Sequence, residues 1–217
     1  MKKSRLFSLG FAVLLTVILC LSLSACGDTS SNGGAGITDN GLIWAKGEDG
    51  VHITGYFGIT EDLVIPASIQ NTPVVAIGNF TFQNNAMLKT ITIPDSVITI
   101  GDRAFYGCHG LTSVTIGNSV TTIGDYAFYD CDGLTSITIP DSVTTIGSCA
   151  FYQCGGLTSI VIPDSVTAIG SSAFEYCYNL KNVYYTGTAE QWAQISIGAY
   201  NSDLTDATIH YNYVPEE

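Results

Sequence analysis

Residues Ala127–Cys149 read AFYDCDGLTSITIPDSVTTIGSC, and this stretch decides the fold because it recurs along the chain. Close copies occupy Ala104–Tyr126 and Ala150–Ser172, and Thr81–Arg103 is a looser copy. The period is 23 residues. It is marked by Ile-Gly dipeptides that begin at Ile77, Ile100, Ile123, Ile146 and Ile169. Self-similarity at a fixed spacing is typical of repeat architectures, in which each unit packs on its neighbours.

Each unit carries more apolar side chains than it can bury alone. Pro140-Asp141-Ser142 is a turn sequence that separates two short extended segments. We expect the Gly of each Ile-Gly dipeptide to permit a further bend through a positive φ. Identical units must stack to cover their apolar side chains, strand on strand at about 4.8 Å. The sequence therefore predicts a right-handed parallel solenoid. The inward positions of one unit are Leu134, Ile137, Ile139, Val143, Ile146, Ala150, Phe151 and Cys154.

The pattern LTSITIPDSVTTIG…AFYxC resembles the leucine-rich repeats of the BspA-like class, which occur in many bacterial surface proteins. The resemblance runs from about Leu42 to Tyr213. It implies a β-rich leucine-rich-repeat solenoid and a role in adhesion or in contact with a host or matrix. Pro-Asp-Ser stands where the commonest leucine-rich repeat has Asn or Cys, so the convex side need not carry a full helix.

The two ends of the repeat array depart from the consensus, as capping units do. Leu42–Tyr56 is predicted to form a β-hairpin with a turn at Lys46–Gly50. A five-residue insertion around Ile69–Pro73 lengthens the first unit. At the other end, Thr188-Ala189-Glu190-Gln191 fits a capping box that opens a helix to about Ile195. Ala207–Tyr213 is predicted to be a closing strand, which completes a helix-plus-strand cap.

Met1–Cys26 is predicted to be a lipoprotein signal peptide. A basic start is followed by an apolar run to about Leu23. Leu23-Ser24-Ala25-Cys26 resembles the lipobox of bacterial lipoproteins, which implies acylation of the Cys26 thiol and a membrane anchor. A plainly cleaved signal and a retained anchor helix are the alternatives. Residues 27–40, rich in Gly, Ser, Thr, Asn and Asp, are predicted to be a flexible linker, and residues 41–217 the solenoid with its caps.

Charge excludes one class of partner. The 217 residues carry a net charge of −12, and three of the seven basic residues lie among the first five. An acidic surface repels phosphate, so nucleic acid is not an expected ligand. We also find no nucleophile–base pair, Walker loop, Rossmann fingerprint or zinc-protease motif. No catalytic residue, metal ligand or cofactor is therefore predicted.

Cysteine and aspartate recur in columns, each with alternative interpretations. The cysteine column is interpreted as buried free thiols, with disulfides or a metal site as alternatives. Cys149 lies off that column and is expected to be the most exposed thiol. The aspartates are interpreted as caps of their own turns, with weak cation sites as the alternative. The columns are Cys108, Cys131, Cys154 and Cys177; Asp95, Asn118, Asp141 and Asp164; and Asp102 and Asp125.

The outward positions of the predicted strands form an uncharged face of small hydroxyl groups. A parallel stripe of Tyr side chains supplies rigid amphipathic area, which suits a binding surface. Plain solvated sheet, and a cover for the groove between turns, are the alternatives for these two surfaces. The candidate ligand-binding face comprises Ser113, Thr115, Ser136, Thr138 and Ser159, with Tyr106, Tyr129 and Tyr152.

Together these features predict a non-catalytic adhesion module on the bacterial cell surface. We expect a monomeric, extracytoplasmic lipoprotein that is held to the membrane by its N-terminal lipid and captures an extracellular protein or glycan. A structural envelope protein that stacks solenoids is the first alternative. An enzyme acting on polysaccharide is the second, because a pair of carboxylates can hydrolyse glycosidic bonds.

Overall fold

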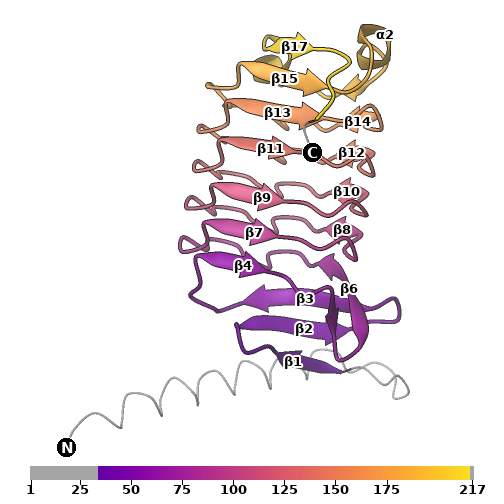
Figure 1. Ribbon diagram of the computed structural model, residues 1–217. Helices are drawn as coiled ribbons and strands as arrows, with labels where there is room; N and C mark the ends of the chain where they lie inside the picture. Colours follow the sequence, from indigo (N-terminus) through magenta and orange to yellow (C-terminus); the bar gives the residue numbers. More distant parts are fainter. Residues whose placement is uncertain (1–33, 216–217) are drawn as a thin grey trace, which may run out of the picture. The chain divides into compact units, whose positions relative to one another are not determined.

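The computed structural model describes residues 34–215 as a solenoid in which each 23-residue repeat forms one turn (Figure 1). One long sheet runs along one side of the turns, and two shorter parallel sheets lie on the other side. Strands of successive turns pair in register, so that Thr122 lies opposite Thr145 and Ile123 opposite Ile146. The predicted repeat solenoid is confirmed. The predicted signal peptide and Cys26 lie outside the described residues. Within the described residues, no helix is long and apolar enough to cross a membrane.

One sheet is continuous from the first turn to the last. Its strands contain the Ile of each Ile-Gly dipeptide, which points into the core. Its strands in the successive turns are β6 (Thr72–Ile77), β8 (Thr99–Ile100), β10 (Thr122–Ile123), β12 (Thr145–Ile146), β14 (Ala168–Ile169) and β16 (Ser196–Ile197), and the N-terminal strands described below extend it.

The strands on the opposite side, which precede the Pro-Asp-Ser turns, form two separate sheets. We refer to this side as the strand face. The first sheet contains β4 (Asp62–Val64), β7 (Thr90–Thr92) and β9 (Ser113–Thr115). The second contains β11 (Ser136–Thr138), β13 (Ser159–Ile162), β15 (Asn182–Tyr185) and β17 (Thr208–His210). The interruption falls between β9 and β11.

The core is the set of inward columns that the repeat predicts. All eight inward positions of the central repeat are at most 3% exposed. The rings of Phe105, Phe128 and Phe151 stack nearly parallel, with centroids 5.0 and 5.2 Å apart. Each ring is fully buried, so removing one would expose the faces of both neighbours.

The Ile-Gly glycines serve close packing, and the predicted positive φ is wrong. Among the described glycines, positive φ occurs only at Gly41, Gly50 and Gly107. A Cβ atom on Gly147 would instead lie 2.6 Å from the carbonyl carbon of Gly124 in the preceding turn. Glycine is needed there because backbone stacks directly on backbone.

The N-terminal end contains the predicted hairpin and one strand more. β2 (Leu42–Lys46) and β3 (Val51–Tyr56) pair antiparallel, and β3 continues in parallel to β6. The insertion forms β5 (Ser68–Ile69), which folds back on β6. β1 (Ala35–Ile37) pairs with β2, so the folded part begins before the predicted boundary at residue 41. Residues 35–37 are strand and not linker.

At the C-terminal end, α2 (Ala189–Trp192) begins with the predicted capping box. The Thr188 side chain accepts from the backbone of Gln191, and the Gln191 side chain accepts from the backbone of Thr188. The helix ends at Trp192, earlier than predicted. A second short helix, α3 (Ser202–Thr205), was not predicted and buries Leu204. β17 occupies the middle of the predicted closing strand.

Candidate functional site

On the strand face, the predicted Ser and Thr residues alternate with buried apolar residues. On β9, Ser113 and Thr115 are exposed while Val114 between them points inward. On β11, Ser136 and Thr138 repeat this alternation. Alternation follows from the two-residue period of a strand. Ser159, on β13, is only half-exposed.

The hydrogen-bond ladder of this face is broken between β9 and β11. The N–H of Thr112 donates to the carbonyl of Lys89 at 2.8 Å, and the N–H of Thr158 donates to Thr135 at 2.9 Å. Among the residues that the structure describes, the equivalent bond from Thr135 to Thr112 is absent.

The same loss occurs at the other end of the two strands. Ile93 donates to the carbonyl of Thr115 at 2.9 Å, and Ile139 donates to Val161 at 3.0 Å. No such bond joins Ile116 to Thr138 within the described part of the chain. Backbone donors and acceptors of both strands are therefore left facing each other without partners, which is unusual for native backbone groups.

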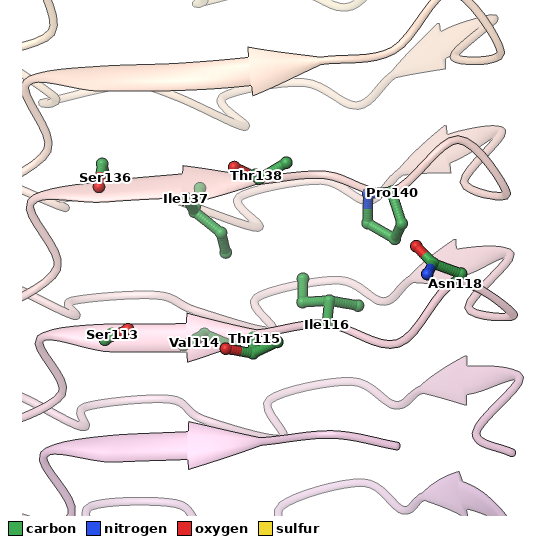
Figure 2. Close-up of a pocket in the computed structure, with 9 residues that line it drawn as sticks. All are labelled: Ser113, Val114, Thr115, Ile116, Asn118, Ser136, Ile137, Thr138 and Pro140. Carbon is green, nitrogen blue, oxygen red and sulfur yellow. The ribbon is translucent and has the colours of Figure 1, made fainter. Parts of the chain in front are cut away.

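A cleft of about 350 Å³ occupies this gap. Figure 2 shows the residues that line it. Four of the predicted binding residues line it, namely Ser113, Thr115, Ser136 and Thr138. Ile116 and Ile137 point toward one another across the gap. Val114 and Ile116 are each 8% exposed, whereas Ile91 and Ile93 at the same positions of the preceding repeat are each 1% exposed. The cleft thus offers hydroxyls, unpaired backbone groups and a strip of apolar surface.

Gly117, between the cleft residues Ile116 and Asn118, departs from the repeat. It stands where Pro94, Pro140 and Pro163 stand in neighbouring repeats. A Cβ atom on Gly117 would lie 2.7 Å from the backbone nitrogen of Asp95, and closer still to the carbonyl of Pro94. Any other residue would clash there, so glycine lets the end of β9 approach the preceding turn.

The three predicted Tyr residues form a stacked ladder that does not line the cleft. The ring centroids of Tyr106 and Tyr129 are 4.5 Å apart, and those of Tyr129 and Tyr152 are 4.8 Å apart. Tyr176 meets the ring of Tyr152 edge-on at 5.0 Å. Because the ring faces cover one another, the ladder presents mainly edges and hydroxyl groups. It is a surface separate from the cleft.

The cysteine column consists of free, buried thiols. Each Sγ donates to the carbonyl of a core Phe, for example Cys131 to Phe105 at 3.2 Å and Cys154 to Phe128 at 3.1 Å. Burial raises the pKa of Cys108 and of Cys177 to about 12. The thiols are therefore protonated near neutral pH and unsuited to nucleophilic attack. Cys149 is half-buried.

Three aspartates of the two columns act between repeats, so the prediction that they cap their own turns is wrong for Asp95, Asp102 and Asp125. Oδ1 of Asp95 accepts from the backbone of Asn118 at 2.7 Å. Oδ1 of Asp102 accepts from Asp125 at 3.0 Å, and Oδ1 of Asp125 accepts from Ser148 at 2.7 Å. Each partner belongs to the next repeat. The sequence reasoning missed this because Asp favours local turn contacts in most chains.

Sequence reasoning also missed a group of three potential metal ligands. One ligand atom each from His109, Asp130 and Asp132 lies within 4.8 Å of the others. The Nδ1 atom of His109 is 3.8 Å from Oδ1 of Asp130. Burial raises the pKa of Asp130, and the nearby imidazole of His109 acts in the opposite direction. The repeat alignment held a signal, because residues 109 and 132 occupy the same column.

Comparison with known proteins gives one family and several solved structures. Residues 75–204 match six copies of the BspA type leucine rich repeat region. A leucine-rich repeat protein of T. pallidum is 33% identical, with a TM-score of 0.63, over 73% of this chain and 71% of that one. A leucine rich cell surface protein of Faecalibacterium prausnitzii is 32% identical, with a TM-score of 0.68, over 75% of this chain and 42% of that one.

A more distant structure shares the fold alone. The pneumococcal vaccine antigen PcpA is 16% identical, with a TM-score of 0.59, over 81% of this chain and 45% of that one. No protein of curated function matches the chain.

Proposed function

The chain belongs to the BspA-type leucine-rich repeat family, and we propose that it is a non-catalytic binding module. Its ligand binds in the cleft between β9 and β11. The family supports a repeat-based role in binding or in structure. The observation that carries the binding role is the local loss of strand pairing. A structural stack would gain nothing from an interruption at one turn.

The chemistry of the cleft favours an uncharged, hydrogen-bonding ligand. Its walls carry Ser and Thr hydroxyls, the amide of Asn118 and unpaired backbone groups, and no charged side chain. Val114 and Ile116, each 8% exposed, add a small area of apolar contact. Its volume lies at the lower end of the usual range for ligand pockets, about 300–1,000 Å³. A segment of an extracellular protein or of a glycan has the required mixture of donors, acceptors and apolar surface.

We also propose that the module works at the cell surface, as a monomer anchored through a lipid on Cys26. The basic and apolar start of the chain and its lipobox-like sequence support this location. The Faecalibacterium relative is described as a cell surface protein, although this chain spans only 42% of its length. Mass spectrometry of the membrane-extracted N-terminus should find a diacylglyceryl group on Cys26. An N-terminus without it would overturn the anchor.

Binding is tested with the full-length chain on a glycan microarray and on a panel of extracellular-matrix proteins. Gly117→Pro restores the residue of the neighbouring repeats and adds a Cβ that must move β9 away from Pro94. We expect this change to narrow the cleft and to weaken binding at least tenfold. Thr138→Val removes one hydroxyl from the cleft wall and should also weaken binding.

The matched control is Thr92→Val, which removes an exposed hydroxyl from the same column outside the cleft. It should bind as the unaltered chain does. Binding that survives both cleft variants would refute the site. Analytical sedimentation distinguishes a binding module from a structural protein that stacks solenoids. A polymer that forms as the protein concentration rises would favour the structural protein.

A further inference from the structure

His109, Asp130 and Asp132 come from two successive repeats, and the fold brings them together. His109 and Asp132 occupy the same column, one repeat apart, and Asp130 precedes Asp132 by two residues. Their ligand atoms lie within 4.8 Å of one another. The His109 imidazole and the Asp132 carboxylate are exposed, while Asp130 is half-buried. The group is thus open to an ion from solution.

The backbone holds these side chains in place. Cys108 precedes His109, and Cys131 separates the two aspartates; both cysteines are fully buried. The N–H of Asp130 donates to the carbonyl of Tyr152 at 2.8 Å. The N–H of Gly155 donates to Oδ1 of Asp132 at 3.3 Å, which leaves its second carboxylate oxygen available.

The repeat itself does not require these three residues. The column of His109 contains Ala86, Gly155 and Tyr178 in other repeats, none of which is a metal ligand. The column of Asp130 contains Asn84, Gly107 and Gln153. The repeat fold therefore does not by itself require an imidazole beside two carboxylates, and among the described residues this group occurs at one junction.

From this arrangement we propose that His109, Asp130 and Asp132 bind one divalent transition-metal ion, Zn²⁺ being the best fit, and that the ion joins the two repeats. Zinc binds His nitrogen and Asp oxygen at about 2.0–2.2 Å, with three protein ligands and water as a common set. Tetrahedral ligands then lie about 3.3–3.5 Å apart, so the observed 3.8 Å between His109 and Asp130 needs only small side-chain movements. The imidazole favours zinc, nickel or copper over magnesium and calcium.

The position of the ion explains what it would do. His109 lies four residues before Ser113 at the start of β9, and Asp132 lies four residues before Ser136 at the start of β11. These are the two neighbouring strands that are not hydrogen bonded to each other. A metal ion bound by both turns supplies a link between the repeats at the end of the cleft. It fixes the separation of β9 and β11 where hydrogen bonds do not.

Calorimetric titration of the chelator-treated full-length chain with ZnCl₂ tests the proposal, with MgCl₂ as the comparison ion. We expect one Zn²⁺ per chain with a dissociation constant in the micromolar range, and no heat from Mg²⁺. His109→Ala and Asp130→Asn should each weaken binding at least tenfold. His52→Ala is the matched control, because His52 also contacts an exposed aspartate, Asp49, and no third ligand completes a group there among residues 34–215.

Hydrogen exchange gives a second readout that does not depend on affinity. Zn²⁺ should slow amide exchange in Thr112–Ile116 and Thr135–Ile139 of the unaltered chain and of His52→Ala, but not of His109→Ala. Zinc binding that persists unchanged in His109→Ala would place the ion elsewhere and overturn the proposal. No binding up to millimolar Zn²⁺ would overturn it as well. Unchanged exchange on binding would overturn the link between repeats.

Discussion

Gly147→Ala tests whether backbone stacking sets the separation of the repeats. The added Cβ would lie 2.6 Å from the carbonyl carbon of Gly124 and 2.7 Å from the backbone nitrogen of Asp125. Ordinary contact begins at 3.4 Å, so the two turns must separate locally by about 0.8 Å. That movement stretches the bond from the N–H of Gly147 to the carbonyl of Ile123, now 2.9 Å. It also stretches the bond from the N–H of Ser148 to Asp125, now 2.7 Å.

We expect Gly147→Ala to lower the free energy of unfolding by about 1–3 kcal/mol, the usual cost of an overpacked site. Gly147 has no positive φ, so the loss would come from the contact and not from backbone strain. Urea unfolding of the full-length chain, followed by Tyr and Trp fluorescence, measures it. Gly155→Ala is the matched control, since its Cβ would meet only Oδ1 of Asp132, at 3.3 Å. Equal midpoints for the two variants would refute the reasoning.

Three further experiments probe other parts of the repeat. Phe128→Ala should lower the free energy of unfolding, measured with urea, by about 3–5 kcal/mol, because the Phe128 ring is stacked on both faces. A decrease of less than about 1 kcal/mol would contradict the stacked core. Asp125→Ala should cost about 1 kcal/mol and Asp125→Asn less, since only the amide keeps an oxygen for the N–H of Ser148; equal losses would argue against that bond. Burial raises the pKa of Cys149 above the value of a free cysteine, which is about 8.5. Its thiolate fraction at a given pH is therefore lower, and its alkylation should become fast only at a more alkaline pH than that of a free cysteine. Peptide mass spectrometry should still find Cys149 labelled before the fully buried column, and the reverse order would contradict the assigned burial.

The repeat fold was predictable because a constant period places like residues in the same column. Five Phe residues and five Ile-Gly dipeptides at one spacing leave stacked units as the arrangement that buries them all. The hairpin and the capping box were equally accessible, since both depend on local turn and cap chemistry. The hydroxyls of the strand face followed from the alternation of strand residues.

The cleft was not predictable, because it depends on a small difference between similar repeats. Gly117 is a single departure from Pro, and a residue type does not report how closely two backbones approach. For the same reason, a positive φ was expected at Gly147, where the structure shows close backbone packing instead. The aspartate bonds and the group around His109 also required three dimensions, because their partners lie about one repeat away in the chain.

Strand pairing is interrupted on only one side of the solenoid, between β9 and β11, so the two sides of the solenoid should differ in stiffness at that turn. β10 and β12 remain hydrogen bonded on the side opposite the gap between β9 and β11. Stretching backbone bonds costs more than sliding apolar side chains, so thermal bending should pivot on the intact side. The solenoid would then flex at one level and in one plane, and the turns on either side of that level would move as blocks.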